Sequence, residues 1–291
     1  MKFWKACYRF AVCLTVVLSL PVTALDEVRY STYDREQLPY DRYYIDLLTL
    51  IMEKSRDKYG DFRLKGVNVG KTQTNIFTLI EHQKVVNIIW TMTSKQREDT
   101  LQPIRIPLFK GMGGCRIFLI RNGQQDRFDL IDGLEQLRKL YAGQGTDWPD
   151  TEILEASNFN VVKAKVHTTL YDMLAKERFD YFPRAIYEAF SEVELHPELA
   201  VEQKFLISYP APFFYFVNRE DTRLASRIEY GLTRIMEDGS FDEFFNANPY
   251  SKNAVEQANI KARKIIELEN PLLTEATQQA LMALNGHSAC Q

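Results

Sequence analysis

The chain has 291 residues, of which 45% are hydrophobic and 26% are charged, and its formal net charge is −3 at pH 7. These proportions are typical of a globular protein with a hydrophobic core, and they exclude a disordered or collagen-like chain. A mildly acidic chain also has no electrostatic basis for binding nucleic acid or an anionic membrane surface, so we expect neither as a partner.

The first 24 residues have the pattern of a secretory signal peptide. Three basic residues precede the apolar run Phe10–Leu20, which ends at Pro21. This run is too short to span a bilayer, which needs about 20 apolar residues. We therefore expect residues 1–24 to be removed, leaving a chain without a permanent membrane span. An uncleaved N-terminal anchor is the alternative.

Only two of the four cysteines, Cys115 and Cys290, lie outside this segment. They could pair in an oxidising compartment. Because Cys115 lies in an apolar stretch, the sequence favours a small buried residue and a separate thiol in the tail over a disulfide.

Strands and helices alternate along most of the chain. Continuous apolar or alternating segments predict strands, and apolar residues spaced three or four apart predict helices. In the first part we expect strands at 27–32, 62–69, 85–90 and 116–121, and helices at 40–58 and 74–82. In the second part we expect helices at 128–140, from Pro149, and at 169–177, with strands at 160–166, 179–182, 201–209 and 213–217. The remainder is predicted to be helical, at 224–237, 241–245 and 254–269.

This order favours an α/β fold with mostly parallel sheets covered by helices. We expect residues 25–112 and 213–291 to form one lobe and residues 113–212 to form a second lobe. Two chain crossings between the lobes, one on each side of the second lobe, would make a hinge with a ligand cleft.

Three segments together resemble the type II periplasmic binding proteins, specifically the bacterial extracellular solute-binding proteins of family 3. They are the strand Val86–Thr93 with Arg97 after it, the turn Gly143–Thr146, and the helix and strand within Met173–Arg184. Gly239-Ser240-Phe241 matches the usual C-terminal pattern of that family. The resemblance covers nearly all of the chain after residue 24.

The resemblance implies a two-lobed periplasmic-binding-protein-like II fold and a monomer in the periplasm. Such a protein binds a small solute between its lobes and delivers it to the permease of an ABC transporter in the inner membrane, often in amino acid transport. Presentation of ligand occupancy to a membrane sensor is an alternative, and an extracytoplasmic enzyme on the same fold is a third. We expect no metal, because the four histidines show no metal-ligand spacing. We also expect no enzymatic activity and no cofactor, because no glycine-flanked nucleophile and no distinct carboxylate pair is found in the sequence.

Ligand-binding residues are predicted at the carboxyl ends of the strands, where open α/β sheets bind their ligands. Hydroxyl groups and a bidentate guanidinium suit a polar or anionic solute, and aromatic side chains give flat walls. A backbone N–H group near Thr146, at the expected start of a helix, would also favour an anion. The predicted set is Tyr33, Trp90, Thr91, Thr93, Arg97, Thr146, Arg184 and Tyr209.

Arg184 decides the expected charge of the solute. Amino-acid binders of this family carry an acidic residue near this position for the ammonium group of the ligand, and this chain has Phe182-Pro183-Arg184-Ala185. An arginine here would repel a cation, so we expect an anionic or carboxylate-bearing solute. The alternative is that Arg184 pairs internally with Asp180 or Glu188.

Overall fold

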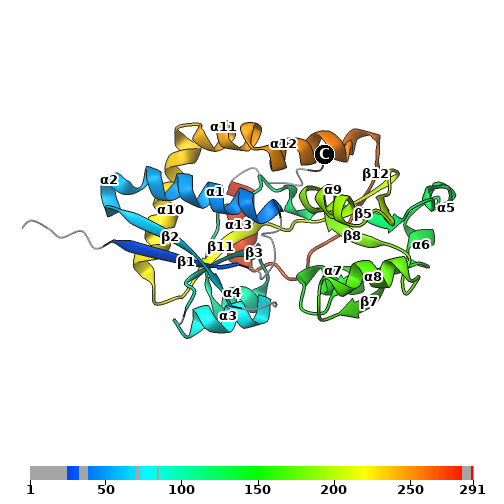
Figure 1. Cartoon of the computed structure of the whole chain (residues 1–291), viewed down its shortest axis with the longest axis horizontal. Helices are drawn as coiled ribbons and strands as arrows, with labels where there is room; N and C mark the ends of the chain where they lie inside the picture. The colour runs from blue at the N-terminus through cyan, green and yellow to red at the C-terminus, as the bar shows by residue number, and fades with distance from the viewer. Residues whose placement is uncertain (1–24, 33–38, 70–72, 84, 284–289, 291) are drawn as a thin grey trace, which may run out of the picture.

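The computed structural model describes residues 25–32, 39–69, 73–83, 85–283 and 290. The predicted signal peptide and Tyr33 lie outside these residues. The elements gather around two sheets that lie side by side along the long axis of the molecule (Figure 1). None of the helices in the described ranges is both long enough and apolar enough to cross a membrane.

The first lobe contains a five-stranded sheet in the order β2-β1-β3-β11-β4. β1 is parallel to β2 and β3, whereas β11 is antiparallel to β3 and β4. The strands are β1 (Asp26–Thr32), β2 (Phe62–Asn68), β3 (Ile88–Met92), β4 (Gln102–Ile104) and β11 (Phe213–Val217).

Helices cover both faces of this sheet because β11 places large side chains alternately on each face. Phe214 and Phe216 pack in one apolar cluster with residues of α3, and Tyr215 and Val217 pack in another with residues of α1 and α10. The helices of this lobe are α1 (Pro39–Lys54), α2 (Arg56–Tyr59), α3 (Gln73–Glu81), α4 (Lys95–Thr100), α10 (Thr222–Glu237) and α11 (Ser240–Ala247).

The second lobe contains a sheet in the order β12-β10-β5-β8, in which β9 also pairs with β5, and a separate parallel pair β6-β7. Its strands are β5 (Cys115–Arg121), β6 (Tyr141–Gly145), β7 (Asn160–Ala164), β8 (Phe182–Ala185), β9 (Leu199–Val201), β10 (Phe205–Ser208) and β12 (Lys264–Glu267). Its helices are α5 (Gln125–Asp129), α6 (Leu134–Leu137), α7 (Pro149–Ala156), α8 (Thr169–Ala175) and α9 (Ile186–Leu195). The α/β architecture expected from the sequence is confirmed. The expectation of mostly parallel sheets was wrong, because β5 is antiparallel to β8, β9 and β10, and β11 is antiparallel to both of its neighbours.

Two of the crossings that join the lobes, at either end of the stretch from β5 to β10, lie against each other. The short helix η1 (Met112–Gly114) leads into β5, and the return crossing passes from Ser208, which pairs with Cys115, towards β11. A Cβ atom on Gly114 would lie 1.7 Å from the carbonyl oxygen of Tyr209, so only glycine allows the two backbones to approach this closely.

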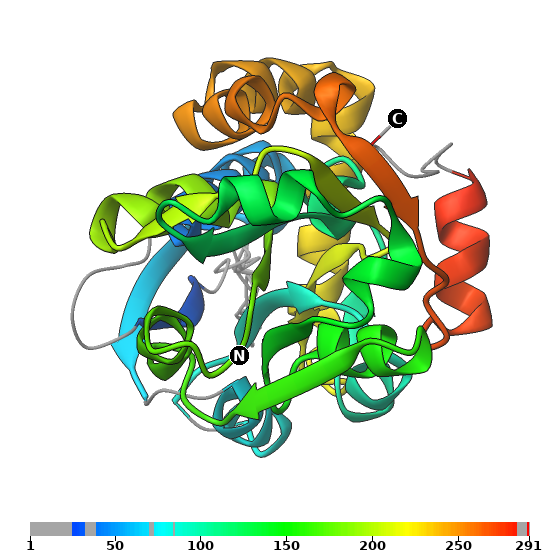
Figure 2. The same ribbon diagram turned by 90° about the vertical axis from the view of Figure 1, so that its right-hand side faces the viewer.

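The C-terminal part departs from the prediction. Residues 254–269 were expected to form one helix, but α12 (Pro249–Ala258) ends at Asn259, which has a left-handed backbone (φ 44°). After the short helix η2 (Ile260–Ala262), β12 pairs in parallel with β10 in the second lobe. The assignment of all of residues 213–291 to the first lobe is therefore wrong for β12, and the other proposed boundaries stay a prediction. Figure 2 shows β12 in orange leading to α13 (Glu275–Ala283) in red.

Two local predictions also differ from the structure. The expected helix at 128–140 is broken into α5 and α6, and the expected turn Gly143–Thr146 lies mostly in β6. The two glycines of that strand are tightly covered, because a Cβ on Gly143 would meet the ring of Phe179 and one on Gly145 would meet Trp148. The rings of Phe179 and Trp148 occupy the space that side chains at Gly143 and Gly145 would take, and this packing explains why a glycine-rich segment forms a strand here.

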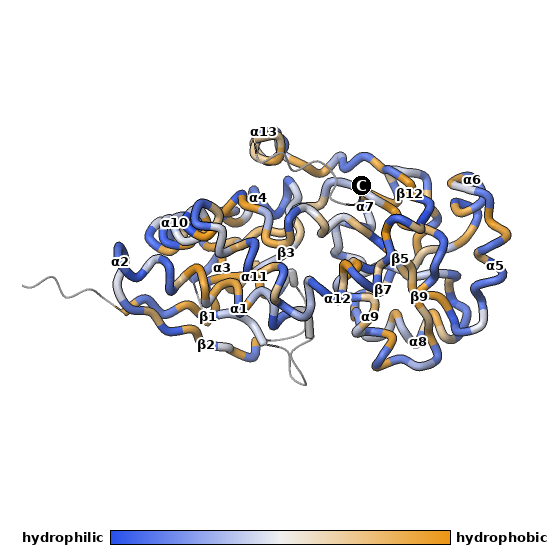
Figure 3. The backbone as a smooth tube through the Cα atoms, turned by 90° about the horizontal axis from the view of Figure 1, so that it is seen from above, coloured by the Kyte–Doolittle hydropathy of each residue, from blue (hydrophilic) through white to orange (hydrophobic). Residues whose placement is uncertain are grey.

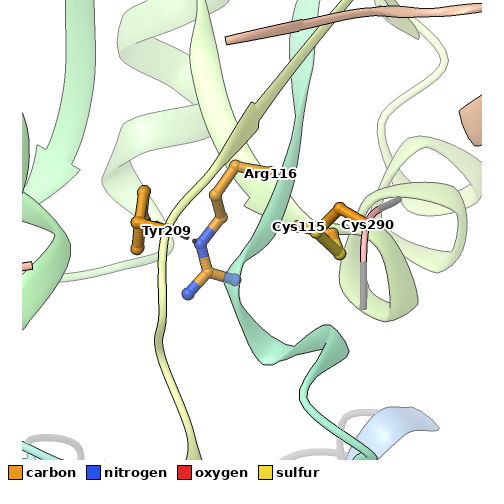
Figure 4. Close-up of a disulfide and its surroundings, with 4 residues drawn as sticks. All are labelled: Cys115, Arg116, Tyr209 and Cys290. Carbon is orange, nitrogen blue, oxygen red and sulfur yellow. Dashed lines mark hydrogen bonds between the residues drawn. A yellow bond between two sulfur atoms is a disulfide. The ribbon is translucent and has the colours of Figure 1, made fainter. Parts of the chain in front are cut away.

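Cys115 and Cys290 form a disulfide with a Cα–Cα distance of 5.7 Å, and both residues are buried (Figure 4). The sequence favoured a buried free cysteine and a separate tail thiol, and this preference was wrong. The pairing could not be seen in the sequence because 175 residues separate the two cysteines and only the fold brings them together.

Candidate ligand site between the lobes

Arg97 connects the end of β3 with the second lobe. Ser94 caps α4 by accepting a hydrogen bond from the backbone N–H of Arg97, which directs the arginine side chain back over the strand. There, its Nη1 donates to Thr91 Oγ1 at 2.5 Å and to the carbonyl of Met92 at 2.8 Å. Its Nη2 donates to the carbonyl of Asp147, in the second lobe, at 3.2 Å.

The surroundings of Arg97 keep a buried positive charge at this position. Burial lowers the pKa of its guanidinium to about 10, and the carboxylates of Asp150, Asp147 and Glu152 oppose that effect. The side chain is therefore charged at neutral pH. Asp147 makes a second contact between the lobes, because its Oδ2 accepts a hydrogen bond from Thr74 at 3.0 Å. Thr91, Arg97 and Asp147 thus lie together where the lobes meet.

Thr146 is exposed beside Asp147, but its backbone does not provide the anion site expected there. Its N–H donates to the carbonyl of Ala164 at 2.9 Å, and α7 begins later, at Pro149. The expectation of an available N–H group at Thr146 was wrong because the turn is the end of a strand. A role for the Thr146 side chain stays a prediction.

The side chain of Thr93 forms a hydrogen bond within the protein and is not available to a ligand. Thr91 and Thr93 were expected to face the ligand together, but the buried hydroxyl of Thr93 donates to Glu98 Oε1 at 2.6 Å. Glu98 also accepts hydrogen bonds from Thr277, Thr274 and Arg105. Burial alone would raise the pKa of Glu98, but these hydrogen bonds lower it. The carboxylate of Glu98 therefore joins the end of β3 to the C-terminal residues Thr274 and Thr277.

Arg184 forms ion pairs within the protein. The sequence analysis gave pairing with Glu188 as one alternative, and this pair is found. Arg184 is 5% exposed, and its guanidinium contacts Glu192 through Nε (2.8 Å) and Nη2 (2.5 Å), and Glu188 through Nη2 (3.1 Å). Asp180 pairs with Arg127 instead. With two carboxylates in contact, Arg184 has no net positive charge to offer to a solute. The expectation that it attracts an anion was wrong for this reason.

Tyr209 belongs to the hinge and not to an open wall. Its hydroxyl donates to Asp150 Oδ1 and accepts from Arg116 Nε at 3.1 Å, and Arg116 Nε also lies 2.7 Å from the same carboxylate. Figure 4 shows Tyr209 and Arg116 side by side next to the disulfide. Since Tyr209 is 2% exposed, we correct its predicted role as a ligand wall.

Trp90 is half-buried and lies beside an acid that the sequence analysis missed. Its indole donates to Asp41 Oδ1 at 3.0 Å, and its ring stacks on Tyr44 and contacts Tyr30. Burial raises the pKa of Asp41 to about 7, and the negative charge of Glu188 in the second lobe adds to the effect. Asp41 lies in the first turn of α1, where an acidic residue is common at a helix start, so the sequence carried no distinct signal.

At the junction of the lobes, the buried arginines have carboxylates nearby, whereas the buried carboxyl group of Asp41 has a neutral hydrogen-bond partner. Arg97, Arg116 and Arg184 each lie near carboxylates. Among the described residues, the hydrogen-bond partner of Asp41 is the neutral indole of Trp90. A carboxylate whose charged form is destabilised by burial favours the arrival of a positive group. An aromatic ring beside it adds a second attraction for a cation.

The comparisons with known proteins agree with this architecture. No family model matches the chain, and no curated protein matches it. An ancestral arginine-binding protein bound to arginine matches with a TM-score of 0.56 and 16% identity, covering 76% of this chain and 96% of that one. The chain has the fold of the type II periplasmic binding proteins. The fold expected from the sequence resemblance is therefore confirmed.

Two further solved structures with this fold belong to a transporter and to a sensor. The binding component of an ABC transporter from Wolinella succinogenes, complexed with lysine, matches with a TM-score of 0.55 and 14% identity, covering 76% of this chain and 94% of that one. A histidine kinase sensor domain similar to periplasmic binding proteins matches with a TM-score of 0.51 and 18% identity, covering 76% and 93%. At such identities the likeness concerns the fold.

Proposed function

We propose that the protein is a periplasmic solute-binding protein that encloses a small amino-acid-type solute between its lobes and delivers it to an ABC transporter. The convergence of charged groups from both lobes supports this proposal. Arg97 of the first lobe reaches Asp147 of the second, and Asp41 of the first lobe lies within electrostatic reach of Glu188 of the second. A solute that contacts both lobes binds the closed form more tightly and shifts the protein towards it.

The chemistry of the site favours a solute with both a cationic group and a carboxylate. Asp41 and Trp90 would receive the cation, because a carboxylate and an aromatic face both attract positive charge. Arg97 and Thr91 would receive the carboxylate, since a guanidinium binds carboxylates through two parallel hydrogen bonds. This replaces the anionic solute expected from Arg184, whose charge is already matched.

A thermal-shift screen of residues 25–291 tests the proposal. We expect arginine or lysine to raise the melting temperature, because a ligand at 100 times its dissociation constant adds about 2.7 kcal/mol of stability. Asp41→Asn should remove the shift. Asp46→Asn is the matched control, since Asp46 lies in the same helix and pairs with the exposed Arg42. A shift with dicarboxylates alone would contradict the cation site, and no shift with any solute would contradict solute binding.

The affinity for a cationic solute should rise with pH up to about 7 and then level off. Asp41 holds its proton up to a pKa of about 7, above its ordinary value of 3.8, so a cation that binds the carboxylate must displace that proton at lower pH. The loss in affinity approaches roughly tenfold for each pH unit below 7. Isothermal titration calorimetry at pH 5, 6 and 8 measures this dependence, and Asp41→Asn should flatten it. A wild-type affinity that does not change with pH would exclude Asp41 from the site.

Sensing is a second candidate function, because a kinase sensor domain shares the fold. In that case the closed form would be presented to a membrane sensor. Uptake of labelled solute by cells that lack the protein separates the two functions: lost uptake supports transport, and normal uptake supports sensing. We propose that the protein is not an enzyme, and recovery of the solute unchanged after incubation with the protein tests this point.

A further inference from the structure

The C-terminal segment is joined to the second lobe by its strand. β12 pairs in parallel with all four residues of β10, from Phe205 opposite Lys264 to Ser208 opposite Glu267. The backbone N–H of Leu268 extends this pairing by donating to the carbonyl of Ser208 at 2.8 Å. Because β10 is entirely buried, this end of the segment is fixed to the sheet of the second lobe.

The same segment then passes along the hinge. The side chain of Asn270 donates to the carbonyl of Pro210, in the return crossing, at 2.7 Å. The carbonyl of Leu272 accepts from the backbone N–H of Lys95, at the start of α4 in the first lobe, at 2.8 Å. The short stretch between β12 and α13 is therefore held by hydrogen bonds to the return crossing and to the first lobe.

A buried carboxylate holds the far end on the first lobe. Thr274 and Thr277 donate to Glu98 at 2.9 and 2.6 Å, and Arg105 donates to Thr277 at 3.2 Å. The side chain of Glu98 is 3% exposed, so these are charge-assisted hydrogen bonds out of water. Figure 3 shows α13 near the junction of the two lobes.

The disulfide adds a covalent connection at the hinge itself. Cys290 is bonded to Cys115, the first residue of β5, where the first crossing enters the second lobe. The described residues of this segment, 264–283 and 290, thus have a strand pairing on one lobe, a carboxylate anchor on the other, and a covalent bond at the hinge.

We propose that these residues, the C-terminal strap, form a further connection between the lobes that limits how far they rotate about the hinge. Hinge motion is absorbed by a few residues in the connections, so a further connection fixed on both lobes restricts its amplitude. Wider rotation requires that the strap leaves Glu98 or that β12 leaves β10. The strap acts on the hinge itself, whichever solute binds.

Distance measurements between the lobes, without solute, test the strap. A ketone-bearing amino acid at the exposed positions Lys65 and Lys176 allows spin labels to be attached without added cysteines. Pulsed electron resonance then gives the distribution of distances between the lobes. We compare the wild type with the variant Cys115→Ser/Cys290→Ser and with the variant Thr274→Val/Thr277→Val.

We expect a broader distribution, with a longer mean distance, in both strap variants. Thr233→Val is the matched control, because this exposed threonine donates to the carbonyl of Glu229 within α10, and it should leave the distribution unchanged. Circular dichroism shows which variants fold, and the two act on different ends of the strap, so one folded variant is sufficient. A wild-type distribution in every folded strap variant would overturn the proposal.

Discussion

Replacing Arg184 with methionine should lower the free energy of unfolding by about 3–5 kcal/mol at neutral pH, the usual cost of removing one partner from a buried ion pair. The variant leaves the carboxylates of Glu188 and Glu192 in contact with an apolar side chain in place of the guanidinium that pairs with both. Urea unfolding followed by tryptophan fluorescence measures the change.

Arg127→Met is the matched control. Arg127 also forms an arginine–carboxylate pair, with Asp180 at 2.8 Å, but its side chain is 42% exposed, so the loss should be below about 1 kcal/mol. Adding Glu192→Gln to Arg184→Met should restore part of the stability, because it removes one of the two unpaired charges. An Arg184→Met protein as stable as the wild type, but unable to bind its solute, would instead assign Arg184 to the ligand.

Acid should destabilise the wild type through the same group of residues. Burial alone would raise the pKa of Glu192, but Arg184 lowers it to about 2, below its ordinary value of 4.5. A group with a lowered pKa contributes stability above its ordinary value and loses it as pH falls towards the folded value. This contribution should therefore disappear between pH 4.5 and 2, and the Arg184→Met variant should not show this loss.

Replacing Arg227 with alanine should cost about 3–5 kcal/mol and lower the melting temperature by roughly 6–20 °C. Arg227 lies on α10 with its side chain fully buried. It contacts Asp26 at the start of β1 (2.6 Å), the hydroxyl of Ser55 (3.0 Å) and the carbonyl of Gly60 (2.7 Å). One side chain thus joins the helix to the first strand and to the end of α2. Calorimetry of the purified variant measures the loss.

Arg223→Ala separates burial from charge in this prediction. Arg223 lies one turn earlier on α10 and also contacts Asp26, at 2.9 Å, but its side chain is 51% exposed. Its loss should change the stability by less than about 1 kcal/mol. Equal effects of the two substitutions would mean that the charge pairing with Asp26, and not the buried contacts, determines the cost.

Local patterns predicted much of the fold but only part of the candidate site. The strand that carries Thr91 and the position of Arg97 after it are properties of neighbouring residues, and both are found. The pairing of Arg184 with Glu192 required the turn from β8 into α9, which brings residues eight apart into contact. Asp41 was missed because its partners, Trp90 and Glu188, come from distant parts of the chain.

The C-terminal misassignment has a similar physical cause. Residues 254–269 are rich in good helix formers, and this composition predicts a helix over their whole length. The pairing of Lys264–Glu267 with β10 overrides that preference, because two isoleucines in this stretch suit a strand beside a buried neighbour. A tertiary contact of this kind leaves no mark in the local pattern.

The position of β12 also affects how the protein folds. β10 is an entirely buried strand, and one of its two neighbours arrives only after the chain has returned through β11, α10 and α11. Until Lys264–Glu267 is in place, the open backbone of β10 is a template for pairing with another molecule. The second lobe, expressed alone as residues 113–212, would have an unpaired edge on β10 and would tend to aggregate. Each lobe has its own sheet, but the second lobe completes its sheet only with a strand that follows much of the first lobe in the chain.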